Sequence, residues 1–248
     1  MNVADTAEDI GARRRAHAPG DAGNFKSLTA SVASALQRDL VAGVYLPGGK
    51  LPIVPLAKHY GVSPGAVREA LSRLISEGLV EFNEQRGFRT APVSQAALMD
   101  ITRTRILIDI HALREAIRLG DVDWEAEVLA MQHRLANCPL RDEGSPNMRD
   151  EWQRLHRVFH RTLIGACGSE WLLRFHDLLF DQAIRYRSLA GIYQLDLRRN
   201  VEAEHADIVN AVIARDAAAA GAAIQKHYML TATLLVKVPG AVTASADP

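Results

Sequence analysis

The first ninety residues contain three segments with helical spacing of hydrophobic positions, followed by two short segments with strand character. From Leu28 to Val41 the apolar positions recur every three or four residues, as an amphipathic helix requires. Gly61 supplies a tight turn, and Ser63 can cap a third helix. The predicted elements are helices at 28–41, at 52–60 and from 63 to the stop at Gly78, and strands at 79–82 and 88–90. This order predicts a winged helix-turn-helix, although it also fits a small helical module for protein contacts.

From residue 95 onward the strand signals disappear and helical periodicity dominates. Asp121 and Ser169 are plausible helix caps, and Gly120 and Gly168 are plausible breaks. Six amphipathic helices are predicted, at about 95–119, 121–138, 147–167, 169–190, 195–215 and 216–238. The predicted fold class is therefore mainly α, with an N-terminal winged helix-turn-helix and a C-terminal antiparallel all-helical bundle of about six helices.

Length and composition agree with two packed domains, because the chain has 248 residues of which 48% are hydrophobic. Two cysteines, Cys138 and Cys167, are too few for a disulfide framework and lack the spacing of a structural zinc site. No stretch has the length of a signal peptide core or a membrane span, so we predict a cytoplasmic protein with no membrane partner. The predicted boundaries are a disordered tail at 1–24, a winged helix-turn-helix at 25–93, a helical effector and metal-binding domain at 94–238, and a second disordered tail at 239–248.

Charge is unevenly distributed, although the whole chain has a formal net charge of zero. Residues 24–92 carry eight Lys and Arg against five Asp and Glu, a net charge of +3. This bias is weak evidence for nucleic-acid binding, since many proteins that never touch DNA contain such a segment.

Residue identities in this segment are more informative than its charge. They include VSPGAVREAL at 62–71, then Arg73-Leu74, EGLV at 77–80 and Arg86-Gly87, preceded by GVYLPG at 43–48. Together they resemble the DNA-binding domain of the GntR family of transcription regulators, over the whole length of the domain. The resemblance implies that the third helix enters the major groove with its N-terminal end foremost.

The same resemblance assigns candidate DNA contacts. Arg68 would be the principal contact to a base or a phosphate, and the wing tip would reach the minor groove or the backbone. Many family members have arginine where this chain has Pro64, which suits a first helical turn but removes a donor. The predicted DNA-binding residues are Ser63, Gly65, Ala66, Arg68, Arg86 and Gly87.

Four histidines of the helical domain lie on apolar stripes. His156 and His160 are one turn apart, and His205 and His227 lie on two later helices. A single inward histidine is usually a satisfied core residue, but convergence of four is unusual. We therefore predict that all four bind a divalent transition metal such as zinc or nickel.

A second resemblance covers about residues 97–238. Phe159-His160, Glu204-His205 and Lys226-His227 resemble the metal-site motifs of the FCD-type ligand-binding domain in the FadR-like branch of GntR regulators. That domain commonly has Asp or Asn at the position of His156, and often Glu at the position of Asp109.

Arg105 shares a helix face with Ile101 and Ile108, so its guanidinium can point into the bundle. Its planar fork suits a carboxylate ligand, and we predict an effector-binding role. Alternatively, Arg105 escapes along the edge of the face or pairs with Asp109.

These features predict a ligand-responsive transcription regulator, a repressor of a metabolic operon that senses a small organic acid at a metal-containing pocket. Its partners would be a palindromic DNA operator and a second copy of the chain, in a homodimer. One alternative is a helical metalloenzyme with an accessory DNA-binding domain, and another is a structural DNA-binding protein without ligand. An enzyme would need a general base, and Glu204 is expected to point elsewhere on its helix. We therefore predict no enzymatic activity.

Overall fold

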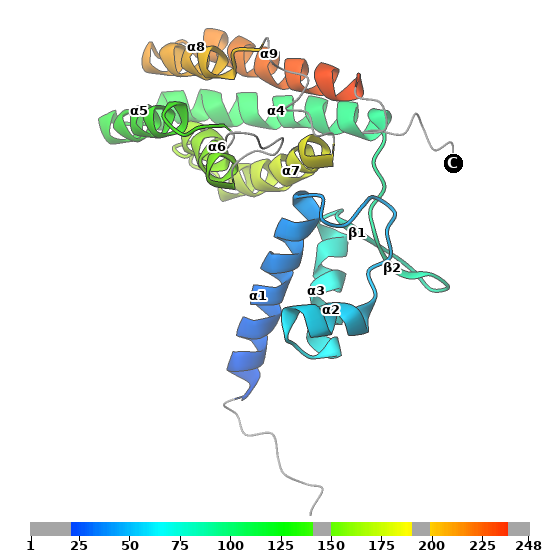
Figure 1. Ribbon diagram of the computed structural model, residues 1–248. Coiled ribbons are helices and arrows are strands. Elements are labelled where there is room, and N and C mark those ends of the chain that lie inside the picture. The colour runs from blue at the N-terminus through cyan, green and yellow to red at the C-terminus, as the bar shows by residue number, and fades with distance from the viewer. Residues whose placement is uncertain (1–20, 141–149, 190–198, 238–248) are drawn as a thin grey trace, which may run out of the picture.

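The computed structural model describes residues 21–140, 150–189 and 199–237. Figure 1 shows two bodies, an N-terminal one built from three helices and a small hairpin and a C-terminal bundle of helices. The chain passes from one body to the other after β2 and continues directly into the long helix α4. The predicted fold class, mainly α with a winged helix-turn-helix and a helical bundle, is confirmed.

The N-terminal body consists of α1 (Asp21–Val41), α2 (Ile53–Tyr60), α3 (Pro64–Ser76), β1 (Val80–Asn83) and β2 (Gly87–Thr90). Its core is formed by leucines and valines of the three helices together with Phe88 of the hairpin. Gly61 ends α2 with a left-handed backbone conformation at φ 66°, which a residue without a side chain adopts at no steric cost. The two strands pair antiparallel, with Phe82 opposite Phe88.

Helix α3 begins as the sequence predicts. The Ser63 hydroxyl accepts a hydrogen bond from the backbone N–H of Ala66 at 3.2 Å, which satisfies one of the free donors of the first turn. Pro64 occupies the first helical position, where its missing N–H costs little.

The C-terminal bundle consists of α4 (Gln95–Leu119), α5 (Val122–Ala136), α6 (Asp150–Leu163), α7 (Glu170–Leu189), α8 (Val201–Ile213) and α9 (Ala217–Val236). In Figure 1, α4, α8 and α9 form an upper layer, and α6 and α7 lie below it, toward the N-terminal body. Helix α4 packs against both α7 and α9, so it runs through the middle of the bundle. The core includes Leu113, Phe159 and Ile208, each fully buried.

Several helix ends differ from the predictions. Helix α1 begins at Asp21 rather than near residue 28, because no proline or glycine pair interrupts the chain after Pro19-Gly20. Helix α8 begins at Val201 rather than near 195, where the Asn200 side chain accepts from the Ala203 N–H and caps it. The predicted tail at 1–24 lies outside the described residues as far as residue 20, and its last four residues belong to α1. The predicted tail at 239–248 and the start of the predicted helix at 147–167 also lie outside the described residues.

A search of the described residues for a helix that is both long and apolar enough to cross a membrane finds none.

Candidate metal centre and candidate nucleic-acid interface

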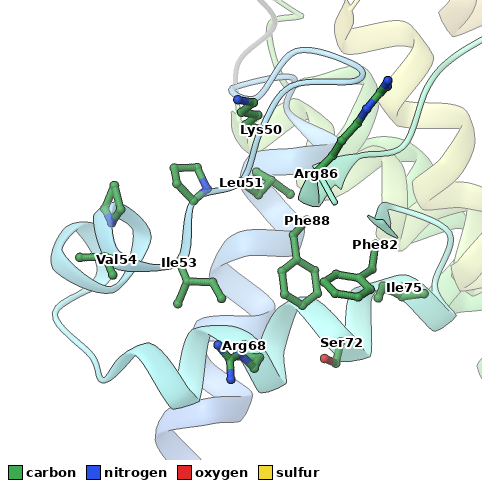
Figure 2. A pocket seen from close by; sticks show the side chains of 13 residues that line it. Lys50, Leu51, Ile53, Val54, Arg68, Ser72, Ile75, Phe82, Arg86 and Phe88 are labelled. Carbon is green, nitrogen blue, oxygen red and sulfur yellow. The ribbon is translucent and has the colours of Figure 1, made fainter. Parts of the chain in front are cut away.

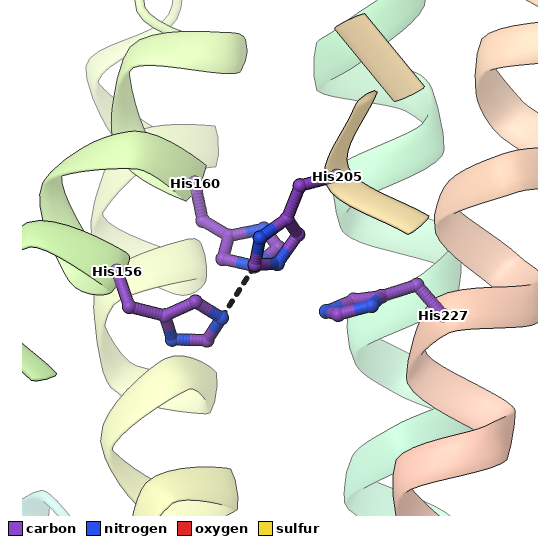
Figure 3. A group of neighbouring side chains, drawn as sticks. All are labelled: His156, His160, His205 and His227. Atoms are coloured by element: carbon purple, nitrogen blue, oxygen red, sulfur yellow. Dashed lines mark hydrogen bonds between the residues drawn. The ribbon is translucent and has the colours of Figure 1, made fainter. Parts of the chain in front are cut away.

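Three helices direct four imidazole rings toward one point in the bundle. His156 and His160 come from α6, His205 from α8 and His227 from α9. One ring nitrogen of each lies within 4.8 Å of the corresponding nitrogens of the other three. Figure 3 shows the rings facing a common centre, and all four side chains are buried. The structure thus brings together the four histidines singled out in the sequence.

Burial keeps these rings neutral. Desolvation lowers the pKa of His156, His160 and His205 well below the usual value for histidine, and neighbouring arginines and histidines lower it further. Burial also lowers the pKa of His227, to about 4. Neutral imidazole is the form that binds a metal ion, so the site is ready to bind one near pH 7.

Glu204 and Tyr228 orient two of the rings from behind. The Nδ1 of His227 donates to the Glu204 carboxylate at 2.7 Å, and the Nδ1 of His160 lies 3.4 Å from the Tyr228 hydroxyl. These contacts leave the Nε2 of both rings turned toward the centre. The expectation that Glu204 points elsewhere is wrong, because its side chain reaches across to α9 while His205, the next residue, faces the core.

Glu204 is itself held by Arg199. The guanidinium of Arg199 donates two hydrogen bonds to the Glu204 carboxylate, at 2.7 and 2.5 Å. Burial acts to raise the pKa of Glu204, but the hydrogen bonds and charges of Arg199 and His227 outweigh it and lower the pKa to about 2. The carboxylate is therefore ionised and fixes the tautomer of His227.

The hydrogen-bonding capacity of the rings supports metal binding. The Nε2 atoms of His156 and His160 lie 3.0 Å apart, and the buried Nε2 of His205 has no hydrogen-bond partner within the described residues. The Nε2 of His156 can bond to that of His160, but in either tautomer the buried Nδ1 of His156 has no hydrogen-bond partner among the described residues. Unsatisfied buried polar atoms cost about 1–3 kcal/mol each, so a cation at the centre would relieve the cluster. The four donors fit zinc, nickel or a similar ion.

Arg105 is buried and lies beside this site. Its guanidinium is 3.4 Å from Asp109, donates to the Tyr228 hydroxyl at 3.0 Å and stacks over the Tyr228 ring. Both alternatives weighed for this residue are therefore realised, since Arg105 points inward and also pairs with Asp109. His176 donates to the other oxygen of Asp109 at 2.8 Å, which makes His176 a buried structural residue.

Asp109 is the acceptor at the centre of this network. The Tyr228 hydroxyl donates to it at 2.7 Å, so one carboxylate links Arg105, His176 and Tyr228. Burial acts to raise the pKa of Asp109, but His176 and Arg105 outweigh it and the pKa is lowered. A small cavity of about 20 Å³ adjoins Arg105, with Thr102, Arg187 and Thr231 also in its wall. That volume is about the size of one water molecule.

Most of the predicted DNA contacts are exposed on the N-terminal body. Ser63, Gly65 and Arg68 are exposed on α3, and Arg86 is exposed at the tip of the hairpin. Gly87 is half-buried and has φ 72°, which turns the chain into β2. Ala66 is an exception and corrects the prediction. Its side chain is only 2% exposed, because it lies one turn before Ala70 on the core face of α3.

Two further arginines of the N-terminal body, Arg89 and Arg73, have partners inside the protein. Arg89 donates to the Gly48 carbonyl oxygen at 2.5 Å and is half-buried. Arg73 lies 3.6 Å from Glu77 in an exposed pair on α3. Neither residue lines the surface groove that contains Arg68 and Arg86.

This groove, which we call the α3–hairpin groove, is the feature that sequence reasoning missed. It has a volume of about 720 Å³ and separates α3 and the start of α2 from the hairpin (Figure 2). Its lining includes Lys50, Arg68 and Arg86 and no acidic residue. No motif signals the groove, because it arises when α2, α3 and the hairpin come together.

Helix α7 connects the histidine site to the N-terminal body. Phe180 packs against the rings of His156 and His160, with centroids 5.8 and 5.9 Å away. The next residue, Asp181, accepts a hydrogen bond from Gln37 of α1 at 2.8 Å and pairs with Arg157 of α6.

Two further contacts of α7 reach the end of α3 and the connection between β2 and α4. Gln182 donates to the Glu77 carbonyl oxygen at 2.6 Å, at the end of α3. Arg185, which is buried, donates to the Ala91 carbonyl oxygen in the connection that leads to α4.

Comparison with known proteins assigns both halves of the chain. Residues 28–89 match the family described as bacterial regulatory proteins, gntR family, and residues 100–229 match the FCD domain. The chain is 38% identical over 195 residues to the HTH-type transcriptional regulator BphR of Paraburkholderia xenovorans, covering 78% of this chain and 79% of the relative. It is 34% identical over 197 residues to the HTH-type transcriptional repressor GlaR of Escherichia coli, covering 78% of this chain and 89% of the relative.

A solved structure shares the fold. Escherichia coli McbR/YncC superimposes with a TM-score of 0.68 over 85% of this chain and 97% of that one, at 21% identity. The matching families and relatives are transcription regulators and not enzymes, which removes the metalloenzyme alternative.

Proposed function

The chain belongs to the GntR family of bacterial transcription regulators and carries an FCD domain, and from this premise we propose that it is a metal-dependent repressor released from its operator by a small carboxylate. The observation that carries the proposal is the convergence of four buried, neutral histidines in the FCD domain. A relative that is 34% identical bears the name of a transcriptional repressor, which supports repression here. We propose that the regulated genes form a metabolic operon.

In this proposal His156, His160, His205 and His227 hold the metal ion. The bound ion would supply Lewis-acid positions that a carboxylate can occupy. Within the described residues, Arg105, Arg187 and Arg199 lie close to the histidines, as do the carboxylates of Asp109 and Glu204. A divalent ion adds positive charge to this buried region, so an anionic ligand is favoured there.

The size of the cavity beside Arg105 indicates how the effector enters. About 20 Å³ holds a water molecule but not an organic acid, so α4 and α9 have to separate for a ligand to bind between them. A ligand that binds only this open form shifts the population toward it. We propose that the open form is the one with low affinity for DNA.

We propose two routes from this opening to the DNA-binding domain. The first is α4 itself, which follows directly from the connection after β2. The second is α7, because Phe180 touches the histidines while Asp181, Gln182 and Arg185 contact the N-terminal body. A shift of either helix would reorient α3 relative to its partner in a dimer.

We further propose a homodimer on a palindromic operator, with domains at 25–93 and 94–238. Two recognition helices in a symmetric dimer contact half-sites about one turn of DNA apart. Ser63, Gly65, Arg68, Arg86 and Gly87 would contact DNA.

The direct test combines elemental analysis of the purified protein with a thermal-shift screen of mono- and dicarboxylates. We expect about one zinc, nickel or similar ion per chain, and a higher Tm with one class of acid only while the metal is bound. DNA affinity should fall steeply with salt and should weaken when that acid is added. Metal-free protein that binds the acid and releases DNA equally well would overturn the proposal.

A further inference from the structure

The α3–hairpin groove combines positive charge at its edges with apolar side chains inside. Figure 2 shows Lys50 and Arg86 on one side of the groove and Arg68 on the other, with Ile53, Phe82 and Phe88 between them. None of the residues lining it is acidic. A groove of this charge fits a polyanion, and in a domain that binds DNA the polyanion is the DNA itself.

The apolar side chains of the groove are unusually accessible. Val54 is 70% exposed, Phe82 54% and Ile75 39%. None of them belongs to the buried core of the domain, although the Phe82 ring packs against Phe88 at its edge. Their exposure indicates that another molecule covers them when the protein works.

The edges of DNA bases offer one apolar group to such a surface. In the major groove the thymine C5-methyl is the prominent apolar group, and it lies beside hydrogen-bond donors and acceptors of the base edges. Arg68 projects from the stripe of α3 that faces the groove, and Ile53 and Val54 at the start of α2 line the same groove. A base that Arg68 contacts would therefore lie close to the apolar side chains of Ile53 and Val54.

We propose that the apolar pair Ile53 and Val54 contacts the C5-methyl group of a thymine in the operator, next to the base pair or phosphate that Arg68 contacts. This inference rests on the proposed entry of α3 into the major groove. Pro64 has no N–H and the Ala66 N–H already donates to the Ser63 hydroxyl, so few backbone hydrogen-bond donors remain at this end of the helix. Apolar contact with thymine then supplies part of the sequence preference.

The experiment removes the methyl group without changing anything else. The full-length protein first selects duplexes from a random-sequence pool. Each thymine of the best duplex is then replaced by deoxyuridine, which keeps the same base pairing, and the Kd is measured. We expect the Kd to rise about fourfold at one or two positions, because burial of one methyl is worth about 0.8 kcal/mol.

Two matched variants connect the methyl effect to the groove. Val54→Ala should bring the Kd values for the thymine and deoxyuridine duplexes closer together, because one of the two side chains that contact the methyl is gone. Val54→Thr, which keeps the shape but replaces one methyl with a hydroxyl, should reduce the difference as well. Val44→Ala changes a valine that is 64% exposed outside the groove and should keep the full fourfold difference.

The outcomes separate this inference from the proposed function. If the protein selects no duplex and its binding does not depend on salt, the DNA-binding role itself fails. If it selects duplexes but no deoxyuridine position changes the Kd, or if Val54→Ala keeps the fourfold difference, the thymine contact is overturned. Loss of self-association in Val54→Ala, with the deoxyuridine effect unchanged, would assign the groove to a second copy of the chain and overturn it too.

Discussion

The two domains place their proposed functional side chains in opposite environments. Arg68 and Arg86 are exposed and do not pack in a core, whereas the four histidines are 1–3% exposed and pack inside the bundle. An exposed arginine has little effect on the free energy of folding, so only binding of a partner reveals its role. A buried imidazole nitrogen without a hydrogen-bond partner costs free energy, so the cluster itself supports the proposed metal.

The largest expected effect tests the buried side of this comparison. His160→Ala removes one of the proposed ligands and the ring that Tyr228 orients, and should weaken metal binding by more than about 100-fold, beyond the loss typical of an outer partner. The rise of Tm on adding metal should vanish, which differential scanning fluorimetry measures. His111→Ala, an exposed histidine on α4, is the matched control and should keep the metal response. Equal metal binding by both variants would show that the cluster is only a packed core.

The exposed side is tested by Arg68→Ala. One good contact to a base or phosphate is worth about 1–3 kcal/mol, so the Kd for DNA should rise roughly 5- to 150-fold. Because Arg68 is exposed and outside the core, the Tm and metal content should not change. Arg38→Ala, an exposed arginine on α1 outside the groove, should bind DNA normally. Wild-type affinity in Arg68→Ala would remove this residue from the interface.

The same contrast explains what the sequence could and could not predict. Helix boundaries were predictable where the caps are local, as at Ser63 and Asp121, because a cap involves residues three positions apart. The histidine cluster was predictable because the apolar stripes of three helices, which carry the four histidines, have to meet inside one bundle. Glu204 was predicted to point elsewhere, because its contact with His227 joins α8 to α9 and helix spacing says nothing about neighbouring helices.

Ala66 shows the opposite error. A family motif places it next to residues that face DNA, but the helical repeat turns its side chain into the core. The α3–hairpin groove was missed for a third reason, since its lining comes from three elements that are separate in sequence. A motif can locate an interface, and the packing decides which of its side chains are exposed there.

A smaller effect sharpens the account of the metal site. Glu204→Gln keeps the size of the side chain but removes the charge that makes His227 a stronger ligand. Metal affinity should fall about 10-fold, as is typical for an outer partner of a ligating histidine. Glu202→Gln, on the exposed face of the same helix, is the control. Competition with a chelating dye measures both, and unchanged affinity in Glu204→Gln would rule out the orienting role.

The pH dependence of the metal-free protein provides a further test of burial. The pKa of His227 is about 4 in the folded protein and near 6.5 when unfolded, so the unfolded state binds more protons below pH 6.5. The folding stability that depends on neutral His227 is fully present above pH 6.5 and is lost as the pH falls toward 4. At pH 5 the loss from His227 is about 2 kcal/mol, or roughly 4–8 °C in Tm. His227→Gln should show a smaller fall between pH 7 and 5, and an identical fall would contradict the assignment.

The smallest expected effect concerns the contacts between the two domains. Asp181→Asn keeps an oxygen that can accept from Gln37 but removes the charge that pairs with Arg157, the residue next to His156. Because coupling between sites is typically spread over several contacts, we expect the change in DNA affinity on adding a carboxylate to shrink about two- to fivefold. Metal affinity should stay the same, since no histidine loses a partner. Asp177→Asn breaks a comparable pair with Arg161 on the same helix, away from α1, and should leave the response intact. If both variants respond like the wild type, the signal does not pass through Asp181, and the direct connection from α4 becomes the route to test.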